Sequence, residues 1–217
     1  MKLVSLNTAM PVSMPYGAQA VETGIGKKPV SGPVRLGWEQ LAGDGQGDRV
    51  HHGGPDKAVC VYAAEHYPYW RGQLGQEMPY GAFGENFTVT GLTEDKVHIG
   101  DIFAVGTAKV QITQPRQPCY KLAAKHEVAD LVLQVQHTGY TGYYFRVIEE
   151  GIVEAGLEII LVERHPLEVT VAEANRLMYR DKRDDAGIRR LLEVDALSES
   201  WRSGFEKRLA EASKQQD

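Results

Sequence analysis

The residue of this chain best suited to covalent or metal chemistry is Cys119, in the stretch Gln-Pro-Arg-Gln-Pro-Cys-Tyr-Lys that ends at Lys121. Two prolines stiffen this loop, and Arg116 and Lys121 bring positive charge near the thiol. Nearby cations favour the thiolate, which is the form of cysteine that attacks electrophiles and binds metals. A free cysteine is more often a small buried side chain, and Cys60 fits that role inside the apolar run Ala-Val-Cys-Val-Tyr-Ala. Because the surroundings of Cys119 are polar and rigid, we predict a functional role for Cys119.

A second group of candidate residues lies in residues 48–57, just before an apolar strand. Gly53 and Gly54 allow the backbone to approach a ligand closely, and their N–H groups suit an anion. In a strand, His51 and His52 would point to opposite faces, so at most one of them readily serves a single site. A polar turn with solvated histidines explains the same pattern equally well.

A third group lies on a loop rich in glycine and proline, where cations alternate with hydroxyl groups: Thr23, Lys27, Lys28, Ser31 and Arg35. This combination suits a phosphate or another anion. The spacing is neither that of a P-loop nor that of a dinucleotide-binding fingerprint. Taken alone, the loop is better explained as a surface loop with solvated lysines.

Two further segments have both a binding and a structural interpretation. Asn86, at the start of a predicted strand, either binds a ligand or closes a turn. The segment 137–146 gathers tyrosines around two glycines, which suits either a pocket for a flat substrate or the core. The sequence lacks the CxxC and HExxH spacings of zinc sites and the GxSxG of a serine triad.

The elements that must position these residues are mostly strands. Before Pro166, short apolar runs rich in β-branched residues alternate with turn signals, which predicts a barrel or sandwich rather than βαβ units. The predicted strands lie within residues 2–6, 57–63, 85–91, 97–106, 108–114, 143–151 and 157–165. Helices are expected at 63–74 and 121–136.

From Thr170 onward, helical signals replace the glycines. Thr170 and Glu173 have the spacing of a capping box, and Trp201, Phe205 and Leu209 repeat at intervals of four residues. Three short helices bury little core alone, so they should dock on the β part. We therefore expect a β domain over residues 1–165 and a small three-helix domain over 166–217.

Composition excludes several classes of protein. The 217 residues are 42% hydrophobic and 24% charged, typical of an ordinary globular protein. The 24 basic and 29 acidic residues give a net charge of -5, which disfavours general nucleic-acid binding. No apolar run reaches the roughly 20 residues that cross a bilayer, and no signal peptide is evident, so we expect no membrane association. With two cysteines in dissimilar contexts, a cytoplasmic location is the simplest expectation.

The order of the segments resembles MOSC-domain proteins of the YiiM type, and residues 169–210 resemble the three-helix domain that accompanies them. The resemblance extends over nearly the whole chain, and its motifs are TGIGKKPVSGPVRL, GDGQGDRVHHGGPDKAVCVY, EHYPYW, GAFGENFTVTGL, VHIGDIFAVG, QPRQPCYK and HTGYTGYYFRVIEEG. It implies a mainly β fold, a MOSC-type β-barrel with a few peripheral helices. It also implies binding of the molybdenum cofactor, with Cys119 as the protein ligand to molybdenum.

The resemblance further implies reduction of N-hydroxylated compounds, base analogues such as 6-hydroxylaminopurine among them, with electrons from a separate flavoprotein reductase. Arg116 and either His51 or His52 are then candidates to polarise the N–OH group or supply a proton. The candidates to hold the phosphate and pterin of the cofactor are Thr23, Lys27, Lys28, Ser31, Arg35, Gly53, Gly54, Lys57, Asn86 and Gln114.

Two alternatives stay open. The same pocket and thiolate would suit a non-catalytic carrier of cofactor or sulfur. The C-terminal helices could instead form a nucleic-acid module, with Arg176, Arg180 and Arg183 as a basic stripe. The balanced charge of residues 170–217, with ten basic and ten acidic side chains, speaks against that module.

Overall fold

The main feature of the protein is an eight-stranded sheet, seen in a computed structural model that describes residues 1–17, 19–47 and 53–214. His51 and His52 lie outside the described residues. In pairing order the strands are β12 (Ile159–Glu163), β8 (Ile102–Val105), β9 (Ala108–Pro115), β10 (Tyr143–Glu149), β6 (Val59–Ala63), β7 (Phe87–Thr90), β1 (Lys2–Thr8) and β4 (Lys28–Pro29). Within this sheet β6 and β7 pair in parallel, and the other neighbours are antiparallel. The chain is therefore mainly β, as its sequence predicts.

The sheet is open, so the predicted closed barrel is not confirmed. Strand pairing runs from β12 to β4 and does not return to β12 in the described residues. The first residues of β1 nevertheless lie beside the segment that leads into β12, because the N–H of Leu3 donates to the Leu157 carbonyl at 2.9 Å. The N–H of Ile159 likewise donates to the Met1 carbonyl at 3.1 Å. In the described residues β1, the neighbour of the edge strand β4, thus meets the β12 edge of the sheet through these short segments.

The predicted strands are confirmed, since each of the seven predicted segments contains one strand of the sheet. Their β-branched and aromatic residues suit a pleated surface, and β6 is buried along its whole length. The pattern did not predict the short edge strand β4 of the sheet, nor two small additions outside it. One is the hairpin of β2 (Val12–Tyr16) and β3 (Gln19–Thr23), and the other is the pair β5 (Val34–Leu36) and β11 (Gly151–Val153).

The first predicted helix is confirmed, and the second is wrong as a single helix. Residues 64–74 form the short 3-10 helix η2 (Ala64–His66) followed by α2 (Tyr67–Leu74). The segment 121–136 contains two helices, α3 (Tyr120–His126) and α4 (Leu131–Thr138). The break occurs at Glu127, whose φ of 56° is left-handed. The N–H of Val128 donates to the Ala123 carbonyl, which completes the C-terminal cap of α3.

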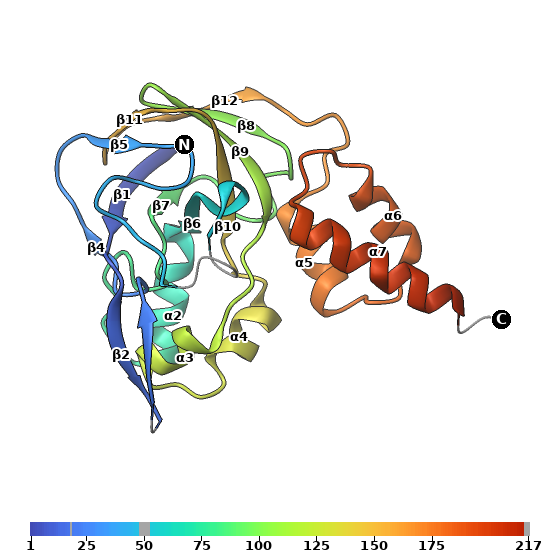
Figure 1. The fold of residues 1–217 in the computed structure, drawn as a ribbon, viewed down its shortest axis with the longest axis horizontal. Helices are drawn as coiled ribbons and strands as arrows, with labels where there is room; N and C mark the ends of the chain where they lie inside the picture. The colour runs from blue at the N-terminus through green and yellow to red at the C-terminus, as the bar shows by residue number, and fades with distance from the viewer. Residues whose placement is uncertain (18, 48–52, 215–217) are drawn as a thin grey trace.

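Three C-terminal helices, α5 (Val171–Tyr179), α6 (Asp185–Leu192) and α7 (Glu199–Lys214), lie together on one side of the sheet, next to β9 (Figure 1). The predicted cap is confirmed, because Thr170 Oγ1 accepts a 2.9 Å hydrogen bond from the Glu173 N–H. None of the helices in the described ranges is long and apolar enough to span a membrane.

One hydrophobic core joins the sheet to the three helices. The same cluster of buried side chains includes Leu3 and Phe145 of the sheet and Leu177, Trp201 and Phe205 of the helices. The helices dock on the β part, as their short length predicts. Of the arginines considered for nucleic-acid binding, Arg176 is paired with two carboxylates, at 2.6 Å and 2.8 Å.

Candidate functional site

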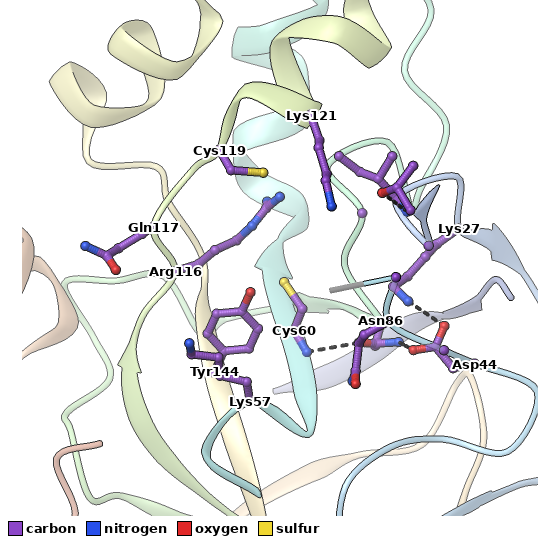
Figure 2. A pocket seen from close by; sticks show the side chains of 17 residues that line it. Lys27, Asp44, Lys57, Cys60, Asn86, Arg116, Gln117, Cys119, Lys121 and Tyr144 are labelled. Carbon is purple, nitrogen blue, oxygen red and sulfur yellow. Dashed lines mark hydrogen bonds and ion pairs between the residues drawn. The ribbon is translucent and has the colours of Figure 1, made fainter. Parts of the chain in front are cut away.

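Both cysteines line one pocket. The pocket has a volume of about 620 Å³ including its open mouth, and side chains from distant parts of the chain converge on it (Figure 2). Its lining comes from residues within 23–27, 44–47, 57–60, 84–86 and 116–121, and from Tyr144. The sequence-predicted residues that the fold brings together here are Thr23, Lys27, Lys57, Asn86, Arg116 and Cys119.

Arg116 is a buried cation in this pocket. It follows β9, is only 7% exposed, and its backbone N–H donates to the Gly142 carbonyl. No carboxylate oxygen of the described residues lies within the 4.0 Å of an ion pair with its guanidinium. Its neighbours include Cys60, Tyr144 and Cys119: burial lowers the pKa of Arg116, and the negative charges that these groups carry once ionised more than offset that effect. A buried cation without a carboxylate is costly, so the site favours a bound anion.

Cys119 lies at the rim of the same pocket, as the residue that precedes α3. In Figure 2 its sulfur points toward the space that also receives the Arg116 side chain. Lys121 follows in the first turn of α3, where it is buried and donates to the Glu22 carbonyl at 3.3 Å. The stiff, cationic loop predicted around Cys119 is therefore present.

Cys60 is the first lining residue that the sequence analysis missed. It was interpreted as a structural side chain, and it is 6% exposed, yet its thiol faces the pocket (Figure 2). Burial raises the pKa of Cys60 to about 11, against an opposing effect of Arg116, so the thiol is neutral near pH 7. Both faces of β6 are buried, so no alternation of apolar and polar residues indicated which side chains face a ligand.

A chain of polar contacts fixes the wall of the pocket opposite Cys119. Lys27 forms an ion pair with Asp44, and both side chains are buried. Asp44 also accepts from the Ala9 N–H at 2.9 Å and from Asn86 Nδ2 at 2.8 Å. Asn86 Oδ1 in turn accepts from the Cys60 N–H at 3.0 Å. The charge of Lys27 is therefore compensated, and Asn86 links the loop of Asp44 to strand β6.

Asp44 and Tyr144 were also missed as site residues. An aspartate in a glycine-rich loop reads as a turn residue, so its partners were invisible in the sequence. The tyrosines of 137–146 were noted, and of these Tyr144 lines the pocket beside Arg116. Burial raises the pKa of Tyr144 well above its ordinary value, so its hydroxyl stays protonated.

Other predicted residues lie outside the pocket. Lys28 and Ser31 are exposed, and Arg35 is 68% exposed with an ion pair to Glu150 at 3.3 Å. Gln114 is buried and accepts a hydrogen bond from Ser200 of α7, so it faces the three-helix region. Gly53 and Gly54 lead into the short 3-10 helix η1 (Pro55–Lys57) and are not part of the lining. These six residues are therefore left out of the proposed site.

Glycines on two loops let the pocket wall form. A Cβ atom at Gly24 would lie 2.3 Å from the Gly45 carbonyl oxygen, and one at Gly47 would lie 2.3 Å from the Glu22 carbonyl oxygen. Any other residue at either position would force the loops apart. The close approach of the two segments thus explains why this region is rich in glycine.

The charge of the described lining favours an anionic ligand with an affinity for sulfur. The cations Lys27, Lys57, Arg116 and Lys121 stand against the carboxylate of Asp44, which leaves a net charge of +3. No group of three or more histidine, cysteine, aspartate or glutamate side chains that could hold a metal ion occurs in the described residues. The lining offers a metal the soft thiolate of Cys119 as a ligand, and its cations suit an anionic group that carries the metal. The residues present fit a phosphorylated, sulfur-containing cofactor.

Two family models match the chain. The MOSC domain matches residues 48–160, and the YiiM-like 3-alpha helix domain matches residues 169–212. Together they cover most strands of the eight-stranded sheet, part of the pocket lining and most of the C-terminal helices, whereas β1, β4 and the lining residues within 23–47 lie outside both matches.

Three relatives extend this likeness over 73–95% of the chain. The protein YflK of Bacillus subtilis (strain 168) is 52% identical over 206 residues, which cover 95% of this chain and 93% of YflK. Protein YiiM of Escherichia coli (strain K12) is 41% identical, over 85% of this chain and 83% of YiiM. A protein named "Reductase" from Gibberella moniliformis is 31% identical over 73% of this chain, which is 29% of that longer protein.

The fold has a close counterpart among solved structures. The crystal structure of YiiM from Geobacillus stearothermophilus superposes with a TM-score of 0.83 at 42% identity, covering 96% of this chain and 98% of the other. This likeness includes the three C-terminal helices as well as the sheet.

Proposed function

Because the chain belongs to the MOSC-domain family of the YiiM type, we propose that it is an oxidoreductase that reduces N-hydroxylated compounds with a molybdenum cofactor bound beside Cys119. The substrate class includes base analogues such as 6-hydroxylaminopurine. The observation that carries the proposal is the buried Arg116, which has no carboxylate partner among the described residues and lies next to a thiol. The reductase-named relative supports the reaction type.

The reaction consumes two electrons and two protons. The N–OH group is converted to N–H, and the oxygen leaves as water. When bound, the molybdenum cofactor supplies the two-electron, oxygen-removing chemistry. We propose that a separate flavoprotein reductase delivers the electrons, since the chain has no flavin or haem motif of its own.

The side chains of the pocket have distinct roles in this proposal. Cys119 provides the soft thiolate ligand to molybdenum. Lys57 and Lys121 bind the anionic phosphate and pterin by charge-assisted hydrogen bonds. Arg116 stays protonated, because its pKa lies above its ordinary value. It therefore orients the substrate oxygen by donating hydrogen bonds, and another group must release the proton. His51 or His52 remains the predicted proton donor.

The first experiment is a measurement of molybdenum content by elemental mass spectrometry. The wild type and the variants Cys119→Ala and Cys60→Ala are purified from a host that makes the cofactor. We expect near-stoichiometric molybdenum in the wild type and in Cys60→Ala, and a large loss in Cys119→Ala. An absence of molybdenum from the wild type, purified from a demonstrably competent host, would contradict the proposal.

The second experiment separates an enzyme from a carrier. With a flavoprotein reductase present, Cys119→Ala should lower the reduction of 6-hydroxylaminopurine by at least about 100-fold, while Cys60→Ala keeps most of the activity. Equal losses in both variants would mean that the two cysteines have been assigned the wrong roles. A wild type that holds molybdenum but has no turnover would point to a non-catalytic carrier of cofactor or sulfur.

A further inference from the structure

Lys57 reaches the pocket from η1, a single short turn whose position is held by residues far away in the sequence. Its neighbour Asp56 lies in the middle of η1. The Asp56 carbonyl accepts a hydrogen bond from Thr113 Oγ1 of β9 at 2.7 Å. The η1 turn is thereby attached to the same strand that leads to Arg116.

The Asp56 side chain connects this turn to the three-helix region. Asp56 Oδ1 accepts from Arg146 at 2.6 Å, and the same Arg146 nitrogen donates to the Ala196 carbonyl at 3.1 Å. Asp56 Oδ2 accepts from the backbone N–H of Glu199 at 3.3 Å. Glu199 is the first residue of α7, and its N–H is among the donors that a helix cannot satisfy internally. A carboxylate at this end of α7 is favourable both as a hydrogen-bond acceptor and toward the helix dipole.

Two further bonds attach the same end of α7 to β9. The Ser198 N–H donates to the Thr113 carbonyl at 3.1 Å, and Ser200 Oγ donates to Gln114 Oε1 at 3.2 Å. Residues 196–200 thus contact Asp56, which precedes Lys57, and Gln114, which lies two residues before Arg116. The start of α7 is therefore bonded to two of the segments that carry cations into the pocket, those of Lys57 and of Arg116.

We propose that the three-helix region fixes Lys57 in the pocket through Asp56, so that Asp56 is a positioning residue of the site. Asp56 does not line the pocket and acts only through the turn that it shares with Lys57. The inference rests on the proposed function only in taking the pocket around Cys119 as the working site. It assigns the C-terminal helices a role in shaping that site.

The test measures the electrostatics of the pocket without any cofactor. Cys119 is alkylated with iodoacetate, which is an anion, and with iodoacetamide, which is neutral. The rate with iodoacetate is then divided by the rate with iodoacetamide, and this quotient is called the ratio below. Because both reagents attack the thiolate, the ratio cancels any change in the ionisation of Cys119. Peptide mass spectrometry counts Cys119 separately from Cys60. Loss of a nearby cation lowers the ratio, and we expect about a fivefold fall for Lys57→Met.

The two possible roles of Asp56, as a positioning residue and as a simple negative charge, predict opposite changes of the alkylation ratio in Asp56→Asn. If Asp56 mattered only as a negative charge, its removal would raise the ratio. If Asp56 positions Lys57, the ratio falls, and we expect a fall of about threefold. On a Lys57→Met background, Asp56→Asn should then have no further lowering effect. A ratio that rises or stays unchanged in the single variant, or that falls again in the double variant, overturns the proposal.

Asp184→Asn is the matched control for folding. Asp184 also accepts from one arginine and from a helix-capping N–H, the N–H of Gly187, and its side chain is 32% exposed against 29% for Asp56. It lies within the three-helix region, away from the pocket lining. We expect a similar loss of stability and no change in the ratio, so a matching change in Asp184→Asn would also overturn the proposal.

A second pair of variants tests the same link from the helix side. Glu199→Pro removes the N–H that reaches Asp56 together with the Glu199 side chain, and proline is well tolerated at the first position of a helix. Glu199→Ala keeps the N–H and removes the side chain. The ratio should fall in Glu199→Pro and stay unchanged in Glu199→Ala. Equal ratios in the two variants would contradict the role of α7, whereas failure of the molybdenum measurement would leave this result unaffected.

Discussion

Cys60 and Cys119 line the same pocket but differ in their surroundings. Cys119 lies at the rim, on a loop stiffened by two prolines, and Cys60 lies inside a strand whose residues are all buried. The sequence identified Cys119 because its neighbours Arg116 and Lys121 are close in the chain. It could not identify Cys60 as a lining residue, because the groups that surround it come from segments far away in the sequence.

The two thiols should differ sharply in reactivity. With a pKa of about 11, Cys60 has about one thiolate in a thousand at pH 8, so iodoacetamide should leave it almost unmodified in the native protein. Because the pKa is raised, the thiolate fraction grows with pH, and the rate should increase about tenfold for each pH unit between 8 and 10. Peptide mass spectrometry after timed alkylation measures this. Labelling of native Cys60 at pH 8 as fast as that of the unfolded protein would show that the thiol is not shielded.

At the scale of elements, the long strands of the sheet were predictable from the sequence, and the β2–β3 hairpin and the β5–β11 pair were not. The seven apolar runs had lengths and compositions that only strands satisfy in a chain with so many turn signals. The break at Glu127 was not predictable, because a glutamate rarely adopts a left-handed conformation and the segment reads as one helix. The wall that includes Asp44 depends on a loop without periodicity, so its position came only from the structure.

That wall yields a prediction about stability. Asp44 accepts hydrogen bonds from Ala9, Lys27 and Asn86, which belong to three separate segments. Asp44→Ala leaves the buried cation of Lys27 unpaired and removes an acceptor from Ala9 and Asn86, so it should lower the free energy of unfolding by about 3–5 kcal/mol. Lys27→Met leaves the carboxylate with two donors and should cost about 1–2 kcal/mol.

Urea unfolding of the two variants, monitored by circular dichroism, measures this difference. Glu22→Gln serves as a control, because Glu22 is an exposed residue of β3 beside the same pocket. Its free energy of unfolding should stay within about 0.5 kcal/mol of the wild type. If Asp44→Ala and Lys27→Met lowered the free energy of unfolding equally, Asp44 would not be the residue that organises the three segments.

At the scale of the whole molecule, the sheet and the C-terminal helices share one core. A boundary near Pro166 was predicted from the change in composition, yet Trp201 and Phe205 belong to the same buried cluster as the strands. The sequence showed that these side chains needed a partner surface, because their spacing formed an apolar face. It did not show which surface, since that depends on contacts between segments far apart in the sequence, such as the bond of Ser198 to Thr113.

A shared core predicts a single cooperative unfolding transition. Trp201→Ala should lower the free energy of unfolding by about 3–5 kcal/mol and shift the signals of strands and helices together. Trp38, which is 55% exposed, provides the control, and Trp38→Ala should change that free energy by less than about 0.5 kcal/mol. Far-ultraviolet circular dichroism and calorimetry test this. Two separate transitions in Trp201→Ala would show that the helices unfold independently of the sheet.

The isolated charge of Arg116 has a consequence for protein engineering. A guanidinium buried without a carboxylate partner among the described residues lowers the stability of the ligand-free chain. A screen that ranks variants by heat resistance would therefore favour an apolar side chain at this position. The most robust variants from such a screen would be those that had discarded the group on which the chemistry depends. Any thermostabilised version of this protein should keep position 116 fixed while the rest of the chain is varied.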